Sequence, residues 1–153
     1  MLGYPFAQQY PISSPYGERT HPITGEKHFH NGTDYATPIG TSILSPVDGV
    51  VAFSSNDDRS GIYLGVKGEG YLISFSHLLS PTKFAGDPVQ KGEVIAVSGN
   101  SGRSTGPHVH LVVKDENGQT IDPETVLPNA PAPKMDNAVL YAAAAAAGIL
   151  AIW

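Results

Sequence analysis

The alternation of apolar and polar side chains along the chain predicts short β-strands. The clearest case is residues 71–77, where Tyr71, Ile73, Phe75 and His77 fall on one face and polar or smaller residues fall mostly between them. A period of two is typical of a strand with one buried face. Similar apolar runs, separated by Gly, Pro, Asn and Asp, predict strands over residues 41–44, 49–54, 62–67, 71–77, 94–98 and 108–114. Many short strands with regular turn signals predict a mainly β fold, an antiparallel sandwich or open, barrel-like sheet.

The same pattern divides the chain into four parts. Residues 1–12 are rich in proline and aromatic residues and are expected to form an extended arm, and residues 13–128 form the β domain. Residues 129–137 are a proline- and alanine-rich linker, a composition that favours a stiff, extended chain. Residues 138–153 are apolar and alanine-rich, which predicts a short C-terminal helix because alanine is the best helix former. This tail is short for a membrane span, which needs about 20 residues.

Composition supports one turn-rich domain and argues against nucleic acid as a partner. The chain has 153 residues with 17 Gly and 13 Pro, which indicates many turns around a single core. The net charge is −5, the isoelectric point is about 5.6, and no Lys/Arg cluster is present. There is no Cys, which excludes disulfides and thiol nucleophiles. The first residues lack the basic and apolar regions of a secretory signal peptide.

Four of the six histidines fall in three short motifs that could build one metal site. Without cysteine, a metal must be held by imidazole and carboxylate groups, which zinc accepts. Catalytic zinc sites usually have three protein ligands and keep one position open. The motifs are His30-Asn31-Gly32-Thr33-Asp34, Ser76-His77-Leu78 and Gly106-Pro107-His108-Val109-His110.

The spacing within two of these motifs has geometric consequences. On a strand, His108 and His110 point to the same face with Cα atoms roughly 6.6 Å apart, so one can bind a metal while the other contacts the metal-bound water. On a straight strand, His30 and Asp34 would be about 13 Å apart, so the chain must bend between them if they share an ion. Taken singly, each motif favours a structural interpretation over a metal site: exposed strand histidines, a turn aspartate with a solvated histidine, or a hydrogen-bonded histidine at the edge of the core.

These motifs belong to a set of six sequence patterns that follow one another over about residues 13–128. They are Ser14-Pro15-Tyr16-Gly17-x-Arg19-x-His21-Pro22, His30-x-Gly32-x-Asp34-Tyr35-Ala36-x-Pro38-x-Gly40-Thr41, Ser45-Pro46-x-Asp48-Gly49-Val50-Val51, His77-Leu78, Val89-x-Lys91-Gly92 and Gly99-Asn100-Ser101-Gly102-Arg103-Ser104-Thr105-Gly106-Pro107-His108-Val109-His110. Together they resemble the lysostaphin/LytM-type zinc peptidases, which cleave peptidoglycan cross-links. The chain departs from the family after the last motif, where Leu111-Val112 replaces an aromatic and an acidic residue.

The resemblance implies one zinc ion per chain, held by His30, Asp34 and His110. It also implies that His77 and His108 are the catalytic histidines. Our hypothesis is that His108 acts as general base, because the glutamate base of the helix-borne zinc peptidases is missing. His77, as an imidazolium or N–H donor, would then stabilise the oxyanion that forms during attack on a peptide carbonyl.

The implied substrate is a peptide cross-link of bacterial peptidoglycan, with contacts expected from Arg19, His21, Asn100 and Thr105. The loop from Arg19 to Gly25 is more similar to members that cut direct D-Ala–diaminopimelate bridges than to those that cut glycine bridges. The alternative is a non-catalytic peptidoglycan-binding or activator module, because some members have lost metal ligands. Here the ligand set is complete.

The tail and the N-terminus suggest a biological setting. Because no signal peptide is visible, we expect a phage-borne lysin, either virion-associated or released to the bacterial cell wall or periplasm. The apolar tail over residues 138–153 would then contact a membrane or a virion protein. The alternative is a helix that packs on the domain or on a second subunit.

Overall fold

The computed structural model describes residues 1–131, and almost all of its regular structure is antiparallel β-sheet. The elements are β1 (Ile12–Ser14), β2 (Gly17–Thr20), β3 (Lys27–His30), β4 (Thr33–Tyr35), β5 (Ser42–Leu44), β6 (Gly49–Asp57), β7 (Gly61–Gly68), β8 (Tyr71–Pro81), β9 (Pro88–Val89), β10 (Val94–Ser98), β11 (Val109–Lys114), β12 (Thr120–Ile121) and α1 (Pro123–Val126). The predicted mainly β, antiparallel fold is confirmed, and each of the six predicted strands corresponds to an observed one. Within these residues the sheet does not close into a barrel.

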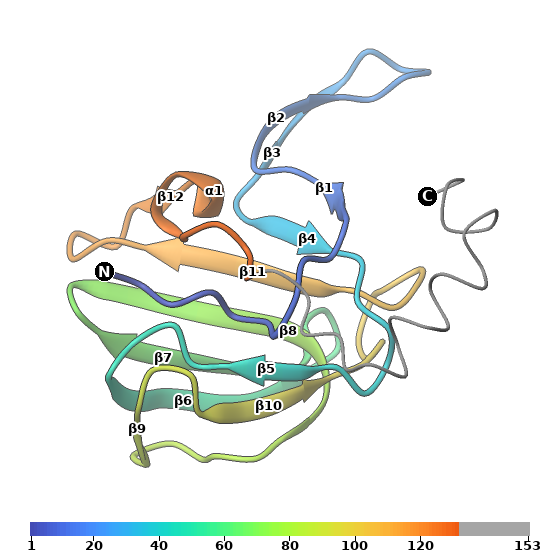
Figure 1. Ribbon diagram of the computed structural model, residues 1–153. Coiled ribbons are helices and arrows are strands. Elements are labelled where there is room, and N and C mark those ends of the chain that lie inside the picture. The colour runs from blue at the N-terminus through green and yellow to red at the C-terminus, as the bar shows by residue number, and fades with distance from the viewer. Residues whose placement is uncertain (132–153) are drawn as a thin grey trace, which may run out of the picture.

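The main sheet has the order β1-β4-β11-β8-β7-β6-β9, with β12 on the edge of β11. β10 pairs with both β5 and the C-terminal part of β8, so the long strand β8 joins two parts of the sheet. β2 and β3 form a separate hairpin, which stands away from the main sheet (Figure 1). This order places β4 and β11 side by side, next to β8, where the candidate histidines lie.

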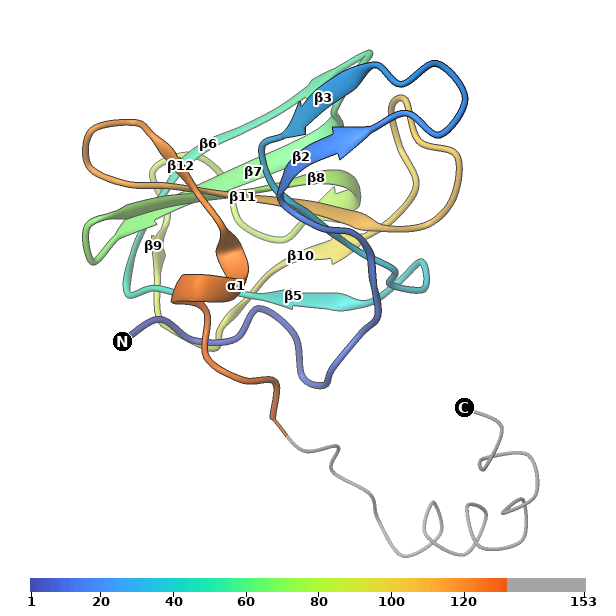
Figure 2. The ribbon, with the colours of Figure 1, turned by 90° about the horizontal axis from the view of Figure 1, so that it is seen from above.

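The core lies between the main sheet and the layer formed by β5 and β10 (Figure 2). On β11 the residues Val109, Leu111 and Val113 are all fully buried, as are Ile73 and Phe75 on the neighbouring β8. Burial of one such side chain stabilises the fold by about 1.5–3 kcal/mol. The opposite face of β8 and β11 carries Ser74, Ser76 and His110, so this face remains available for polar chemistry.

The N-terminal segment contributes directly to the core. Phe6 is almost completely buried and makes edge-to-face contacts with Tyr4, Tyr10 and Tyr35 at ring-centroid distances of 5.9, 5.4 and 5.3 Å. The backbone of the segment also bonds to the domain, since Leu44 N donates to the carbonyl of Pro5 over 2.8 Å. The segment is extended, as expected, but it packs as part of the domain.

β8 is irregular at His77, and here the predicted alternation is wrong. Ile62 of β7 pairs with Leu78, while Leu64 pairs with Phe75, so β8 has one extra residue in this stretch. Such a β-bulge reverses the facing of the residues that follow it. Leu78 therefore occupies the core face, fully buried. His77 takes a left-handed backbone conformation with φ of 64°, which is uncommon for a residue other than glycine.

The predicted helical tail over residues 138–153 lies outside the described residues, as does most of the linker. Within residues 1–131, α1 is a single turn, capped by the Asp122 side chain, which accepts the N–H of Glu124. No helix in this part of the chain is long and apolar enough to cross a membrane.

Candidate metal and catalytic site

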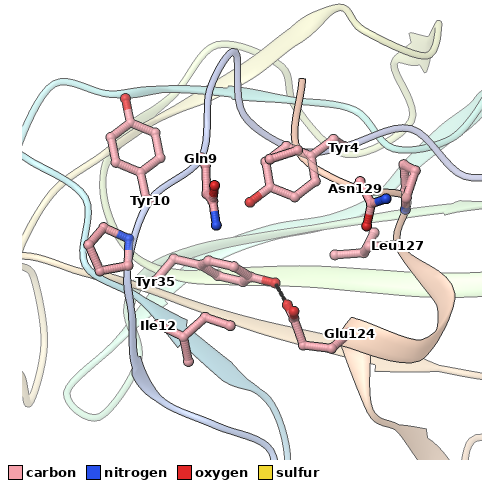
Figure 3. Close-up of a pocket in the computed structure, with 11 residues that line it drawn as sticks. Tyr4, Gln9, Tyr10, Ile12, Tyr35, Glu124, Leu127 and Asn129 are labelled. Atoms are coloured by element: carbon pink, nitrogen blue, oxygen red, sulfur yellow. Dashed lines mark hydrogen bonds between the residues drawn. The ribbon is translucent and has the colours of Figure 1, made fainter. Parts of the chain in front are cut away.

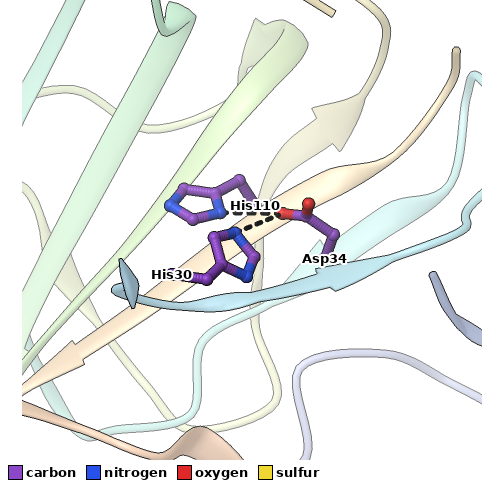
Figure 4. Close-up of side chains that lie close together, drawn as sticks. All are labelled: His30, Asp34 and His110. Carbon is purple, nitrogen blue, oxygen red and sulfur yellow. Dashed lines mark hydrogen bonds and ion pairs between the residues drawn. The ribbon is translucent and has the colours of Figure 1, made fainter. Parts of the chain in front are cut away.

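His30, Asp34 and His110 meet on the polar face of the main sheet, and their ligand atoms all lie within 4.8 Å of one another (Figure 4). Asp34 on β4 is the direct cross-strand partner of His110 on β11. The Oδ1 atom of Asp34 lies 2.7 Å from Nδ1 of His110 and 3.5 Å from Nε2 of His30. One imidazole nitrogen from each histidine and one carboxylate oxygen thus converge on a small volume.

The approach of His30 to Asp34 depends on the bend between β3 and β4. His30 ends β3 and Asp34 is the middle residue of β4, so the chain turns at Asn31 and Gly32. A β-carbon on Gly32 would lie 2.3 Å from the carbonyl oxygen of Leu111 and 3.0 Å from Cε1 of His110. Only glycine therefore allows the bend to pack this closely against β11.

The electrostatics of the site favour an ionised carboxylate and a neutral imidazole. Burial acts to raise the pKa of Asp34, but the hydrogen bond from His110 and the nearby imidazoles outweigh it, so the pKa lies below its ordinary value of 3.8. Burial lowers the pKa of His30 below 6.5, although the Pro15 carbonyl and Asp34 act in the opposite direction. These are the protonation states in which the two groups can bind a metal.

Hydrogen bonds orient the rings of both histidine ligands. The carbonyl oxygen of Pro15 lies 2.9 Å from Nδ1 of His30, and a carbonyl can only accept, so Nδ1 carries the hydrogen and Nε2 presents its lone pair. The side-chain oxygen of Asn31 lies 3.0 Å from Nε2 of His110 on the side away from Asp34. Two imidazoles and one carboxylate, oriented by such contacts, fit a single zinc ion.

His77 and His108 lie beside the metal ligands. The ring centroid of His77 is 4.7 Å from that of His108 and 6.4 Å from that of His110. Nε2 of His108 lies 3.9 Å from Oδ1 of Asp34. His108 precedes β11 and is not on the strand itself, contrary to the expected range 108–114, yet it still reaches the same site as His110.

Each of these two histidines gives its Nδ1 hydrogen to a backbone carbonyl of the loop over residues 99–108. Nδ1 of His77 lies 2.8 Å from the carbonyl oxygen of Ser101, and Nδ1 of His108 lies 2.8 Å from that of Gly106. In the neutral form, both rings therefore carry the lone pair on Nε2. Burial lowers the pKa of His77 below 6.5, which favours this neutral form.

The four residues expected to bind substrate are all exposed and lie on two segments, the β2–β3 hairpin and the loop over residues 99–108. Arg19 is on β2, where its guanidinium donates to the hydroxyl of Ser14, and its charge acts to lower the pKa of His30. His21 follows β2, and its Nδ1 accepts the backbone N–H groups of Ile23 and Thr24. Asn100 and Thr105 belong to the loop over residues 99–108. Their roles remain predictions.

Several supporting groups were not predicted from the sequence. Asn31 lies within the predicted bend between His30 and Asp34, and its side chain contacts His110. The hydroxyl of Ser104 lies 3.0 Å from Nδ1 of His108 and donates to the carbonyl of Gly106. The available signal was that Asn31 lies inside the motif from His30 to Asp34 and Ser104 inside the longer pattern that ends at His110. The carbonyls of Pro15, Ser101 and Gly106 carry no side-chain signal at all.

A separate pocket of about 240 Å³ lies on the other side of β4 (Figure 3). Tyr35, which follows Asp34 and so points to the opposite face, is buried there and donates from its hydroxyl to Glu124 Oε1 over 2.6 Å. The N-terminal segment and the residues after α1 form the rest of its wall. The pocket contains none of the candidate metal or catalytic residues.

Comparison with known proteins agrees with this geometry. The sequence pattern of peptidase family M23 matches residues 28–123, which contain all five histidine and aspartate residues of the site. The peptidoglycan DD-endopeptidase ShyA of Vibrio cholerae is 40% identical over 115 residues, 72% of this chain and 27% of the relative. The chain thus spans about a quarter of the length of that relative.

Solved structures show the same fold. A zinc-containing peptidase from Vibrio cholerae superposes with a TM-score of 0.73 and 36% identity, over 85% of this chain and 40% of that one. A mutant catalytic domain of the prophage-encoded M23 protein EnpA from Enterococcus faecalis superposes with a TM-score of 0.67 and 31% identity, over 79% of this chain and 94% of that domain. The predicted resemblance is confirmed: this chain belongs to peptidase family M23, a family of zinc metallopeptidases.

Proposed function

We propose that this chain is a zinc-dependent endopeptidase that hydrolyses peptide cross-links of bacterial peptidoglycan. The observation that carries the proposal is the convergence of His30, Asp34 and His110 beside two further histidines, whose Nε2 atoms have no hydrogen-bond partner within residues 1–131. A domain that only binds peptidoglycan would not need this complete set. The names of the relatives, which include DD-endopeptidases, support the same substrate class.

His108 is suited to act as the general base. Its Nδ1 hydrogen is held by the carbonyl of Gly106, so Nε2 is the nitrogen that can accept a proton. That nitrogen faces the metal ligands, 3.9 Å from Oδ1 of Asp34. Zinc, when bound by the three ligands, supplies a Lewis acid that activates water and polarises the peptide carbonyl. His108 would take the proton of that water and could later give it to the leaving amine.

His77 can stabilise the oxyanion only in its imidazolium form. A neutral ring with its hydrogen on Nδ1 has no hydrogen on Nε2, and the Ser101 carbonyl holds Nδ1 in the donor state. The neutral N–H donor that the sequence also allowed therefore does not fit. A second proton, on Nε2, would let His77 donate to the developing oxyanion, and burial of the ring makes that proton easy to return.

For the bond cleaved, we propose the direct D-Ala–diaminopimelate bridge. Support comes from the loop that begins at Arg19 and from the DD-endopeptidase names of the relatives ShyA, ShyB and ShyC. Arg19 and His21 on the β2–β3 hairpin, with Asn100 and Thr105 on the loop over residues 99–108, are the proposed substrate contacts.

The test is digestion of purified peptidoglycan of both direct-bridge and glycine-bridge types by the zinc-loaded chain, with products identified by mass spectrometry. A chelated sample and His110→Ala serve as controls. Conversion of cross-linked dimers to monomers in direct-bridge wall alone is the expected result. Cleavage of glycine bridges would overturn the bond assignment. Absence of cleavage in both walls, with zinc bound, would favour a binding or activator module.

We further propose a bacteriophage setting, in which the chain acts at the cell wall as a virion-associated or released lysin. The prophage origin of EnpA supports this setting by analogy. In this proposal the apolar tail over residues 138–153 contacts a membrane or a virion protein. Mass spectrometry of particles purified from a lysed producing culture tests it. Detection of the chain in the particles is expected for a virion-associated form, and absence from both particles and lysate would refute the proposal.

A further inference from the structure

The side chain of Ser101 joins two strands at the bulge beside His77. The backbone N–H of Ile62 on β7 donates to the Ser101 hydroxyl oxygen over 3.0 Å. The same hydroxyl donates to the carbonyl of Leu78 on β8 over 2.5 Å. Ile62 and Leu78 are paired residues of the two strands, next to the extra residue of β8. The hydroxyl therefore bridges a donor and an acceptor at the point where the ladder is irregular.

The backbone of Ser101 holds the ring of His77. Its carbonyl oxygen accepts the Nδ1 hydrogen of His77 over 2.8 Å. The backbone N–H of His77 is held separately, by the carbonyl of Ser60 over 2.8 Å. Because the φ of His77 is in the left-handed region, its backbone needs such support to persist. One residue thus fixes both the strand after His77 and the imidazole itself.

Close packing limits movement of this residue. A β-carbon on Gly61 would lie 2.3 Å from the Ser101 hydroxyl oxygen, and a β-carbon on Gly102 would lie 2.3 Å from the backbone nitrogen of Gly61. The turn before β7 and the loop over residues 99–108 are therefore in direct backbone contact. They are also joined by the N–H of Arg103, which donates to the carbonyl of Arg59 over 2.9 Å.

We propose that Ser101 is a positioning residue for His77. The Ser101 hydroxyl holds the loop against the bulge, and this contact positions the Ser101 carbonyl beside the ring of His77. The carbonyl then selects the Nδ1-protonated form of His77 and orients Nε2 toward the substrate side. The proposal rests on the peptidase function proposed above. It predicts that removal of the hydroxyl lowers turnover without removing the metal or weakening substrate binding.

Ser98 provides a matched control on the same stretch of chain. It is buried, its hydroxyl accepts the N–H of Thr41 over 3.0 Å, and it donates to the carbonyl of Pro38 over 2.8 Å. Like the Ser101 hydroxyl, the Ser98 hydroxyl joins two backbone groups, but the Ser98 carbonyl accepts the N–H of Gly40 over 3.0 Å and not a histidine ring. Ser98→Ala and Ser101→Ala should therefore be destabilised similarly, whereas only Ser101→Ala should lose turnover.

The experiment compares the zinc-loaded full chain with both variants. For Ser101→Ala we expect kcat to fall about 10- to 100-fold with KM nearly unchanged, as for a misplaced catalytic group. Zinc content should stay at one per chain, and ¹⁵N NMR of the His77 ring should show loss of the single Nδ1-protonated form. Ser101→Thr, which keeps the hydroxyl, should restore most of kcat and the NMR signature.

Three results would overturn the proposal. One is a Ser101→Ala variant with wild-type kcat and an unchanged His77 signal, and another is an equal loss of kcat in Ser98→Ala. If Ser101→Ala does not fold, Ser101→Cys, whose thiol makes weaker hydrogen bonds, replaces it in the experiment. The third result would then be a Ser101→Cys variant with wild-type kcat and an unchanged His77 signal. If the wild type cleaves no peptidoglycan, the proposed function fails, but the NMR comparison still tests whether Ser101 positions His77.

Discussion

The side-chain oxygen of Asn31 lies 3.0 Å from Nε2 of His110, on the opposite side of the ring from the Asp34 carboxylate. Nδ1 of His110 shares a hydrogen with Oδ1 of Asp34 over 2.7 Å. A metal bound at Nδ1 would displace that hydrogen, and the single hydrogen of the neutral ring would then be on Nε2, where the Asn31 oxygen can accept it. Asn31 thus sets the form of His110 that binds a metal, although it is not one of the three residues of the ligand cluster itself.

Substitution of Asn31 should weaken zinc binding without removing a ligand. We expect Asn31→Ala to raise the zinc dissociation constant by about 10- to 100-fold, because outer contacts of this kind fix the orientation of a ligating imidazole. Competition with a coloured chelator measures the constant. Asn117→Ala, at an exposed turn position away from the site, should bind zinc as the wild type does. Equal affinity of Asn31→Ala and wild type would refute the role.

Substitution of His110 should abolish metal binding, whereas substitution of His108, only two positions away, should abolish catalysis alone. His110→Ala should lose zinc, because it removes one of the three converging ligands. His108→Ala should keep one zinc per chain but lose turnover by about 10²- to 10⁴-fold, the usual contribution of a general base. Elemental analysis and peptidoglycan digestion measure the two properties. A His110→Ala variant that retains both zinc and activity would contradict the ligand assignment.

The strands and the groups that gather at the site could be predicted because both follow from local patterns. Alternation located six strands within a few residues, and the spacing of His108 and His110 placed both on one side of a strand end. The requirement for a bend between His30 and Asp34 followed from strand length alone. The structure meets it with Gly32, which packs against the backbone of β11.

The supporting contacts could not be predicted because they depend on residues distant in sequence and on backbone groups. The bulge at His77 depends on how β7 pairs with β8, and no local sequence pattern between Phe75 and Leu78 indicates that β8 has an extra residue there. The alternation alone therefore placed His77 on the core face. Similarly, the carbonyl of Pro15, 15 residues before His30, has no side-chain identity that a pattern could reveal.

Gly32 should not tolerate a side chain. In Gly32→Ala the new β-carbon would lie 2.3 Å from the Leu111 carbonyl oxygen, so the bend must shift away from β11 and carry His30 with it. We expect a loss of about 1–3 kcal/mol in the free energy of unfolding, as for other overpacked positions, together with weaker zinc binding. Urea denaturation and chelator competition measure the two effects. Gly106→Ala, where no atom lies within 4 Å of the added carbon, should change neither strongly. A stable Gly32→Ala protein with normal zinc affinity would show that the bend adapts.

Acidification should destabilise the metal-free protein, partly through His77. Burial lowers the pKa of His77 in the folded state below its ordinary value of 6.5, so on acidification the unfolded chain binds a proton before the folded chain does. The stability contributed by the neutral ring is present above about pH 6.5 and is lost as the pH falls below it, until the folded state is also protonated.

His77→Gln should therefore lose less free energy of unfolding than the wild type between about pH 7.5 and a pH about two units lower, as measured by urea denaturation with a chelator present. Parallel pH dependence of His77→Gln and wild type would mean that the ring is solvated well enough to titrate normally.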